Sequence, residues 1–205
     1  MGKLIFKYAT MNSGKTLDLI IRAYNYNETN QKVIIMKPKI DDKGDKKIVS
    51  RTGLEQDVDF LINKDDSIID ILAHKLKDIR IILVDESQFL NKEQIDELFA
   101  LTKSLNIDVV CYGLRNNFKM EAFEGSRRLL EIADELDQFT SLCVCGNIAS
   151  YVGRKYKGVF QTDGEVVVID KLENQKNYEY IPLCGECYLS KVKKIDLQKI
   201  KKKVI

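Results

Sequence analysis

The stretch Ala9-Thr10-Met11-Asn12-Ser13-Gly14-Lys15-Thr16 decides how this chain folds. It follows a short apolar, β-prone run at residues 3–8 and precedes a segment of helical character that begins at Leu17. A strand, a glycine-containing loop and a helix in this order are the context of a phosphate-binding loop. The loop amides and the positive end of the helix dipole favour a bound phosphate there. We expect Lys15 to neutralise the β- and γ-phosphates of ATP and Thr16 to hold Mg²⁺.

The first position of this loop departs from the usual pattern, because Ala9 stands where a glycine is common. Alanine replaces glycine only where φ is negative, so we expect a slightly different turn at this residue. A Gly-Lys-Thr triplet can also occur in a loop by chance. The flanking strand and helix, together with an acidic strand end further along the chain, favour a functional loop.

Unbroken apolar runs mark the other strands of the predicted sheet. These strands lie at residues 33–36, where Lys37-Pro38 is expected to end the ladder, and at residues 80–85 and 109–112. Cys111 lies inside the last of them and is expected in the core. Because the strands alternate with helical segments, we predict an α/β fold of the P-loop, RecA-like type, with a mostly parallel sheet flanked by helices.

Three further helices are predicted from periodicity and capping signals. One covers residues 67–77 with Ser67 as its N-cap, and one runs for about 12 residues from a capping box at Asn91 and Gln94. The third covers residues 121–136, and its core-facing residues are Phe123, Leu129, Leu130, Ile132, Ala133 and Leu136. The only histidine, His74, is expected on the surface of the first of these helices.

The strand at residues 80–85 ends in acid and supplies the second half of a nucleotide site. Asp85 is expected to face Mg²⁺, directly or through water. Glu86 is the candidate general base, because phosphate transfer to an alcohol benefits from a group that accepts the hydroxyl proton. Gln88 and Phe89 complete the run, and both should face the same cleft. The alternative is an acidic pair that only begins a helix.

Two close cysteine pairs lie near the end of the chain, Cys143-Val144-Cys145 and Cys184-Gly185-Glu186-Cys187. Four thiolates satisfy tetrahedral Zn²⁺, and a closed site of four sulfurs is structural rather than catalytic. Buried free thiols are the alternative. The intervening segment, residues 155–182, is polar, so metal binding would supply the free energy that orders it as a lid able to exclude water.

The change of pattern near residue 140 divides the chain. We predict a nucleotide-binding α/β domain at residues 1–140, a zinc-binding lid or lasso domain at 141–190 and a basic tail at 191–205. The tail carries seven lysines and is expected to be a solvated terminus.

Composition narrows the class of protein further. The chain has 205 residues, 44% of them hydrophobic and 31% charged, with a net charge of +2. Acidic and basic residues are interspersed, which argues against a dedicated nucleic-acid binder. We find neither a signal peptide nor an apolar run of the roughly 20 residues that span a membrane. We therefore expect a cytoplasmic protein with reduced cysteines.

These motifs together resemble the thymidine kinase family of the small, zinc-containing type over nearly the whole chain. The resemblance rests on Thr10 to Thr16, Ser50-Arg51-Thr52-Gly53, Asp85-Glu86-Ser87-Gln88-Phe89, Cys111-Tyr112-Gly113-Leu114-Arg115, Phe118, Phe123-Glu124-Gly125-Ser126 and the cysteine pairs.

The resemblance implies transfer of the γ-phosphate of ATP to the 5′-hydroxyl of thymidine or deoxyuridine. It implies that residues 9–16 and 85–88 bind ATP and Mg²⁺, with Glu86 as the base. It also implies a homotetramer and the feedback nucleotide dTTP. The residues that match the family's nucleoside pocket are Met11, Phe89, Leu114, Phe118 and Tyr180, the last of which stacks on the base.

The chain departs from the family in two places. The segment Ile169 to Glu173 lacks the paired glycines that are usual there, which leaves the register of Tyr178 against Tyr180 open, and Lys43 stands where an arginine is usual. Two other classes remain as alternatives: a RecA- or helicase-like ATPase with a zinc ribbon, and a non-enzymatic zinc-ribbon binding module with a degenerate loop. DNA-stimulated ATP hydrolysis would mark the first of them.

Overall fold

The computed structural model describes residues 1–41, 44–166 and 177–204 and contains two compact units. The first unit comprises Met1–Tyr8, Gly14–Arg115 and Phe123–Phe139. The second comprises Ala9–Ser13, Asn116–Ala122 and Thr140–Ile205. Three features of the sequence lie wholly or partly outside the described residues: Lys43, which stands where an arginine is usual, the β-prone run at residues 164–169, and the segment Ile169 to Glu173, which lacks the paired glycines.

A six-stranded sheet forms the centre of the first unit. Its order is β5-β2-β6-β7-β1-β8. The strands are β5 (Phe60–Ile62), β2 (Lys32–Pro38), β6 (Ile79–Val84), β7 (Asp108–Leu114), β1 (Leu4–Ala9) and β8 (Glu135–Gln138). The pairs β1–β8, β2–β5, β2–β6 and β6–β7 are parallel. The predicted α/β fold with a mostly parallel sheet is confirmed.

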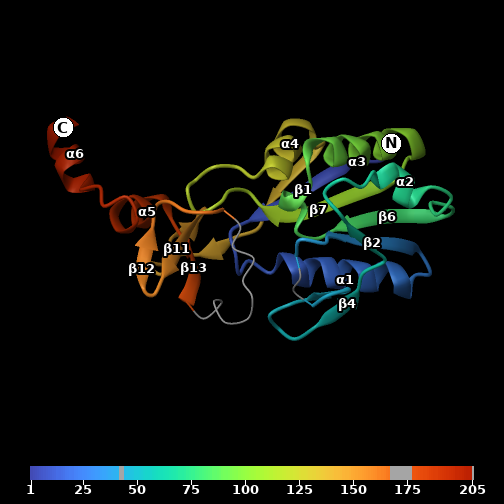
Figure 1. The fold of residues 1–205 in the computed structure, drawn as a ribbon, viewed down its shortest axis with the longest axis horizontal. Coiled ribbons are helices and arrows are strands. Elements are labelled where there is room, and N and C mark those ends of the chain that lie inside the picture. The colour runs from blue at the N-terminus through green and yellow to red at the C-terminus, as the bar shows by residue number, and fades with distance from the viewer. Residues whose placement is uncertain (42–43, 167–176, 205) are drawn as a thin grey trace. The chain divides into compact units, whose positions relative to one another are not determined.

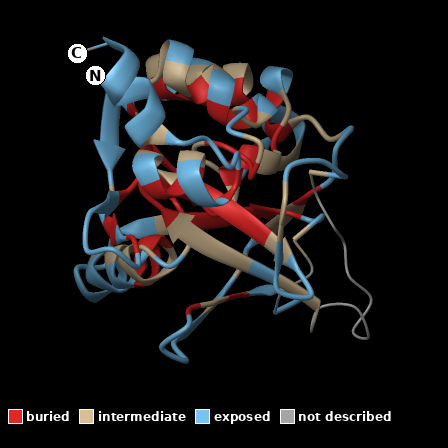
Figure 2. Ribbon diagram, turned by 90° about the vertical axis from the view of Figure 1, so that its left-hand side faces the viewer, coloured by how far each residue is buried: buried red, intermediate tan, exposed pale blue. Residues whose placement is uncertain are grey.

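Helices cover both faces of this sheet (Figure 1). Helix α1 (Lys15–Glu28) packs on one face, and α2 (Ile68–Leu72), α3 (Lys92–Leu105) and α4 (Glu124–Ile132) pack on the other. Successive strand residues point to opposite faces. Ile34 and Met36 therefore join the core under α3, whereas Ile35 joins the core under α1. Figure 2 shows the resulting pattern, with buried residues concentrated in the central strands.

The core on the α3 side also contains Cys111, whose thiol is fully buried. Burial raises the pKa of this thiol well above its ordinary value. The expectation that Cys111 is a core residue is confirmed. A small antiparallel hairpin, β3 (Lys47–Val49) with β4 (Glu55–Asp57), completes the first unit.

Helix α3 begins at the capping box that the sequence predicts. Asn91 accepts a hydrogen bond from the Gln94 amide at 2.8 Å, and the Gln94 side chain accepts one from the Asn91 amide at 3.2 Å. This reciprocal pair satisfies two N–H groups that the first turn leaves open. The predicted capping box is confirmed.

Two predicted helices are shorter than expected. Ser67 caps α2 as predicted, but the helix ends at Leu72 rather than residue 77. His74 has φ of +62° and lies in the turn after the helix, so its predicted helical position is wrong. Helix α4 begins at Glu124 and ends at Ile132, not at residues 121 and 136. Leu136 lies instead in edge strand β8 and is 50% exposed, so its predicted place in the core is also wrong.

The predicted end of the second strand also needs correction, because β2 includes Pro38, which pairs with Ile62 of β5. The Lys39 amide donates to the Ile62 carbonyl at 2.8 Å. The nitrogen of the preceding residue, Pro38, therefore faces away from β5. On that side β6 has already ended at Val84, so no ladder hydrogen bond is lost.

The second unit contains a three-stranded antiparallel sheet of order β12-β11-β13 and a two-stranded pair, β9 with β10. Its strands are β9 (Ser141–Leu142), β10 (Ile148–Ala149), β11 (Tyr151–Tyr156), β12 (Val159–Gln161) and β13 (Tyr178–Leu183). Helices α5 (Gly185–Lys191) and α6 (Leu197–Val204) follow. Among the described residues, no helix combines the length and the apolarity that a membrane crossing requires.

One short turn of the first unit is packed unusually closely. This turn, the 3₁₀ helix η1 (Ser87–Phe89), follows the acidic end of β6. A Cβ atom added at Gly113 would lie 2.8 Å from the Gln88 Oε1 atom, and one added at Gly125 would lie 2.5 Å from the Ser87 carbonyl oxygen. Both neighbours of the turn, β7 and α4, therefore need glycine to approach it.

We predict that Gly125→Ala destabilises the protein by about 1–3 kcal/mol, because the new methyl group meets backbone that cannot move aside. The measurement is denaturant unfolding followed by circular dichroism. Gly185→Ala is the matched control, since its added methyl group would meet only a ring carbon of Tyr151 at 3.4 Å. Equal effects of the two substitutions would contradict this interpretation of the packing.

Candidate functional site

The glycine-containing loop joins β1 to α1, as the sequence predicts. Gly14 is the N-cap of α1 and has φ of +83°, a conformation that favours glycine. Ala9 is the last residue of β1 and is not among the residues with positive φ, which agrees with the expectation for alanine there. Asn12 also has positive φ, at 64°. The loop therefore turns through Asn12 and Gly14 to begin the helix at Lys15.

The residues of this loop are divided between the two units. Ala9 to Ser13 belong to the second unit, and Gly14, Lys15 and Thr16 belong to the first. Thr10 is buried, and its hydroxyl shares a hydrogen bond with the Ser141 hydroxyl. Met11 is half-buried, and Asn12 is exposed.

Lys15 lies close enough to the acidic end of β6 for their charges to interact. The Lys15 side chain is 9% exposed. Burial lowers the pKa of Lys15, while the charges of Glu86 and Asp85 oppose that shift. The loop lysine and both carboxyl groups therefore form one charge cluster, the Lys15–Asp85–Glu86 cluster.

The carboxyl group of Asp85 is strongly perturbed by its surroundings. Its amide donates to the Met36 carbonyl at 3.0 Å, and the residue is 5% exposed. Burial and the neighbouring charge of Glu86 raise the pKa of Asp85 to about 8. A nearby cation would stabilise the ionised form of this carboxyl group. The Asp85 carboxylate fits Mg²⁺, which takes carboxylate and hydroxyl oxygens as ligands.

Glu86 has φ of +49° and ψ of +34°, a left-handed conformation that is costly for a residue with a side chain. The following turn is bound to β7. The Ser87 hydroxyl donates to the Tyr112 carbonyl at 2.9 Å, and the Leu114 amide donates to Gln88 Oε1 at 3.0 Å. The Gln88 amide group donates in turn to the Glu86 carboxylate.

Two of the predicted nucleoside-pocket residues lie in the first unit. The Phe89 ring meets the Phe123 ring edge to face, with centroids 5.7 Å apart. Leu114 ends β7, and its carbonyl accepts a hydrogen bond from the Ser126 hydroxyl at 2.5 Å. The structure therefore places Lys15, the acidic strand end, Phe89 and Leu114 within one unit.

The other predicted pocket residues, Met11, Phe118 and Tyr180, lie in the second unit. Phe118 is 1% exposed, and its carbonyl accepts a hydrogen bond from the buried Tyr188 hydroxyl. Tyr180 pairs across the sheet with Arg154. Tyr178 lies two residues away on the same face, so both tyrosines point to the side of the sheet that carries the Arg154 side chain.

Arg154 is a buried residue that the sequence did not single out. Its guanidinium carbon lies 3.6 Å from the centroid of the Phe118 ring and 5.4 Å from that of Tyr178. It also donates to the carbonyls of Asp163 and Glu165. A single arginine among polar residues carries no pattern that distinguishes this role from that of a solvated side chain.

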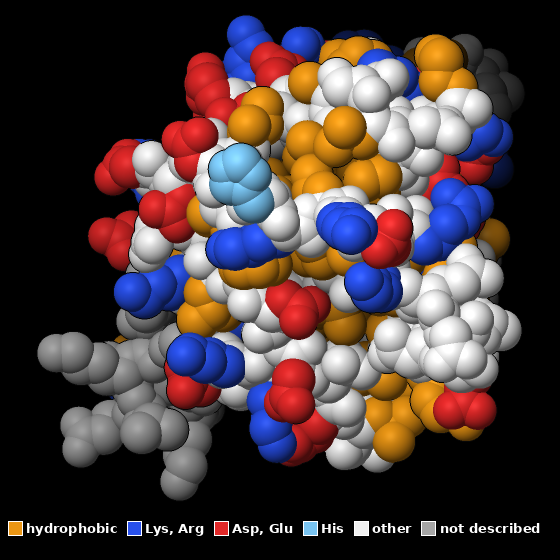
Figure 3. Space-filling view, turned by 90° about the vertical axis from the view of Figure 1, so that its right-hand side faces the viewer, with side chains coloured by type: hydrophobic (Ala, Val, Ile, Leu, Met, Phe, Trp, Pro, Cys, Tyr) orange, Lys and Arg blue, Asp and Glu red, His pale blue; other side chains and the backbone are white. Residues whose placement is uncertain are grey.

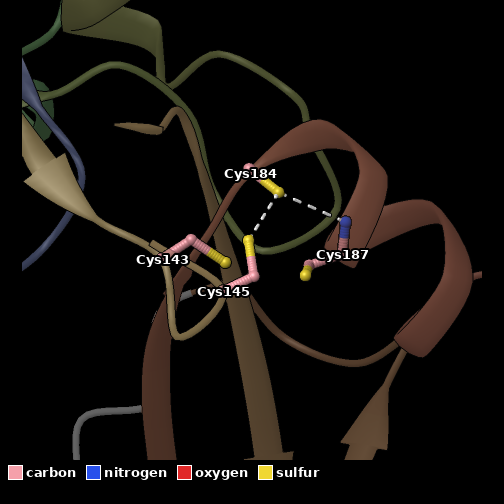
Figure 4. Close-up of side chains that lie close together, drawn as sticks. All are labelled: Cys143, Cys145, Cys184 and Cys187. Atoms are coloured by element: carbon pink, nitrogen blue, oxygen red, sulfur yellow. Dashed lines mark hydrogen bonds between the residues drawn. The ribbon is translucent and has the colours of Figure 1, made fainter. Parts of the chain in front are cut away.

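The four predicted metal ligands lie together in the second unit (Figure 4). The sulfur atoms of Cys143, Cys145, Cys184 and Cys187 all lie within 4.8 Å of one another. They come from the turn between β9 and β10 and from the first turn of α5. This donor set and spread are compatible with one tetrahedral Zn²⁺.

Backbone amides support the cysteine cluster. The Cys187 amide donates to the Cys184 sulfur at 3.4 Å, and Gly146, with φ of +88°, closes the turn after Cys143. Burial opposes ionisation of Cys143, but hydrogen bonds from the amides of Cys145 and Cys184 lower its pKa to about 6. Metals bind thiolates rather than thiols, so these amide donors favour the ligating form.

His74 lies near the opposite end of β6 from the Lys15–Asp85–Glu86 cluster, which does not favour a role for it as the base. It lines a cavity of about 630 Å³ with Ile79, where β6 begins, whereas Asp85 follows the other end of that strand. Figure 3 shows the histidine on this face beside exposed hydrophobic side chains.

The chain is similar to known proteins over nearly its whole length. A family model described as Thymidine kinase matches residues 2–188. A protein of Mannheimia succiniciproducens named Thymidine kinase is 38% identical over 199 residues, which cover 95% of this chain and 99% of that protein. One of Pasteurella multocida with the same name is 37% identical over 195 residues, with coverage of 94% and 99%.

Among solved structures, Bacteroides Pif1 bound to ssDNA aligns with a TM-score of 0.32 and 15% identity, over 63% of this chain and 32% of that one. A likeness this slight supports no statement about function.

The raised pKa of Asp85 predicts a pH-dependent stability in the absence of metal and nucleotide. The pKa of Asp85 is about 8 in the folded state, against an ordinary value of 3.8. The contribution of this group to the free energy of unfolding is therefore fully present below about pH 4 and is lost as the pH rises through about 8. We predict that Asp85→Asn gains melting temperature over the parent protein progressively between these limits. A difference in melting temperature that is constant with pH would contradict the burial of this charge.

Proposed function

The chain belongs to the thymidine kinase family, and on this premise we propose that it transfers the γ-phosphate of ATP to the 5′-hydroxyl of thymidine. The single observation that carries the proposal is the Lys15–Asp85–Glu86 cluster, in which a loop lysine and two strand-end carboxyl groups interact. A phosphate donor bound by the loop would then present its terminal phosphate to an acceptor beside a carboxylate.

In this proposal the loop and the strand end bind different parts of the phosphate donor. Residues 9–16 hold the phosphates of ATP through backbone amides, with Lys15 supplying positive charge. The Thr16 hydroxyl and Asp85 would hold Mg²⁺, which supplies neutralisation of the charge that develops on the transferred phosphate. Ser87 and Gln88 follow in the strand-end segment that the family pattern assigns to nucleotide binding.

Glu86 is proposed as the general base. Its carboxylate would accept the proton of the 5′-hydroxyl as that oxygen attacks the γ-phosphorus and ADP leaves. The left-handed backbone at Glu86 turns the chain from β6 into η1, and such strain clusters at active sites.

The nucleoside pocket is proposed from the family pattern and from the character of the residues. Met11, Phe89, Leu114 and Phe118 would line it, and Tyr180 would stack on the base. Apolar and aromatic lining with few charges suits a pyrimidine, and deoxyuridine fits the same pattern as thymidine. Arg154, stacked on Phe118, would support this aromatic wall.

The four clustered cysteines are proposed to hold one structural Zn²⁺. Among the described residues this is the group that could ligate a metal through four sulfurs. We further propose the division into a nucleotide-binding domain at 1–140, a lid domain at 141–190 and a basic tail at 191–205. A homotetramer, feedback by dTTP and a cytoplasmic location belong to the same proposal and rest on the family resemblance alone.

The test of the proposed activity is an ATP-dependent phosphorylation screen across the common ribo- and deoxyribonucleosides, with single-stranded and duplex DNA added in parallel. We expect thymidine, and secondarily deoxyuridine, to be phosphorylated. ATP hydrolysis that DNA stimulates, without any nucleoside product, would instead indicate the helicase-like alternative.

We predict that Glu86→Gln lowers kcat by roughly 10²- to 10⁴-fold, because the amide cannot accept the hydroxyl proton. The dissociation constant of ATP, measured by calorimetry, should remain near that of the parent protein. Glu93→Gln, on the exposed side of α3, is the control and should leave both quantities unchanged. A large loss of ATP affinity in Glu86→Gln would show that the base assignment is wrong.

We predict one Zn²⁺ per chain by elemental analysis, lost after prolonged chelation. Loss should increase hydrogen exchange around residues 143–149 and 184–188, because the metal supplies much of the ordering free energy of such units. Cys143→Ser should lower the zinc content, whereas Cys111→Ala, which removes a buried thiol outside the cluster, should retain it. Protection unchanged after verified removal of zinc would count against a structural role.

A further inference from the structure

Gln88 occupies a position between the candidate base and the end of β7. It is 2% exposed, although it carries a polar side chain beside a proposed catalytic site. Its Oε1 atom accepts the Leu114 amide at 3.0 Å, and its Nε2 atom donates to Oε2 of Glu86. The side chain therefore connects the backbone of a proposed nucleoside-pocket residue to the carboxylate of the proposed base.

The orientation of the Gln88 amide is fixed by its partners. A backbone N–H can only donate, so the atom that faces Leu114 must be the oxygen. The nitrogen then faces Glu86, where a carboxylate can only accept. An interchange of the two atoms would bring two donors together at Leu114 and two acceptors together at Glu86, so this arrangement has one stable orientation.

The turn that carries Gln88 is held on several sides. The Ser87 hydroxyl donates to the Tyr112 carbonyl, and Gly113 and Gly125 bring β7 and α4 against the turn with no room for a methyl group. The Leu114 carbonyl accepts from Ser126, so the group to which Gln88 is bound is itself fixed. Gln88 can therefore transmit a fixed position to Glu86.

We propose that Gln88 is a positioning residue for the catalytic carboxylate, in place of the nucleotide-binding role that the family pattern assigns to it. The proposal rests on the proposed function, since it assumes that Glu86 is the base. Glu86 lies on left-handed backbone and is half-buried, so the donor from Gln88 restricts the rotation of its carboxylate. A buried amide already engaged at both ends is poorly placed to bind phosphate.

The test is steady-state kinetics on two variants. Gln88→Met keeps the volume and removes both hydrogen bonds, whereas Gln88→Glu keeps the acceptor for Leu114 and replaces the donor to Glu86 by a second carboxyl group that repels it when ionised. We expect both to lower kcat by on the order of 10- to 100-fold, with KM for ATP and for thymidine changed by less than about threefold. If Gln88→Met does not fold, Gln88→Leu, which also removes both hydrogen bonds without adding a charge, takes its place.

Gln94→Met is the matched control, because Gln94 is also a glutamine that is 2% exposed, in the same unit, but its side chain bonds to backbone at Asn63 and Asp66. It should lower the melting temperature and leave kcat unchanged. An equal loss of kcat in Gln94→Met and Gln88→Met would mean that loss of fold, and not positioning, explains the effect.

A second readout separates action through Glu86 from other roles. In a Glu86→Asp background the shortened carboxylate no longer reaches Gln88, so Gln88→Met should cost less than about threefold further in kcat. If Gln88→Met lowers kcat by the same factor in the Glu86→Asp background as in the parent protein, the proposal is overturned. A raised KM for ATP with unchanged kcat would identify a nucleotide ligand instead, and unchanged kinetics would show that the base needs no such support.

These outcomes are distinguishable from failure of the proposed function. Full activity in Glu86→Gln would show that Glu86 is not the base, whatever the Gln88 variants do. An inactive Glu86→Gln together with normal Gln88 variants would overturn the positioning role alone.

Discussion

Two buried ionisable groups, Lys15 and Asp85, interact with half-buried Glu86 at one end of β6, and the neighbouring turn and strand are built around this cluster. Burial favours the neutral forms of both Lys15 and Asp85, whereas each favours the charged form of the other. Two carboxyl groups face one ammonium group, so the second carboxyl group ionises fully only when a further cation offsets its charge. A site of this kind is costly to the apo protein and suited to a nucleotide that arrives with Mg²⁺.

Close backbone packing holds the residues next to this cluster in place. Gly113 and Gly125 allow β7 and α4 to approach the turn after Glu86, and hydrogen bonds from Ser87 and to Gln88 fix it. The left-handed conformation of Glu86 is thereby over-determined by its neighbours. Rigid support of this kind would suit the general base proposed at Glu86, because proton transfer depends on geometry to within a fraction of an ångström.

Much of this could be predicted from the sequence, because strong local signals agree with the fold. The loop from Ala9 to Thr16, the apolar strand before Asp85 and the complete capping box at Asn91 each specify their own structure. The four cysteines specify their cluster because metal-ligand spacing is visible in sequence. The α/β class follows from the alternation of apolar strands with helices.

The rest could not be predicted, because it is decided by tertiary contacts. Helical periodicity continues past Ile132, but pairing with β1 makes residues 135–138 an edge strand. Pro38 fits a strand only because β6 ends before it. Arg154 and the hydrogen bond from Gln88 to Glu86 join residues whose sequence carries no pattern for them.

A crystal structure with a bisubstrate analogue, in which thymidine and adenosine are joined through phosphates, tests directly whether Lys15 and Glu86 act on one reaction. If Glu86 accepts the proton of the acceptor hydroxyl, phosphate oxygens will lie against Lys15 and the thymidine 5′-oxygen will lie within hydrogen-bond reach of Glu86, at about 3 Å. A complex in which the phosphates bind at Lys15 while the 5′-oxygen lies beside another group, away from the Glu86 carboxylate, would contradict this role of Glu86.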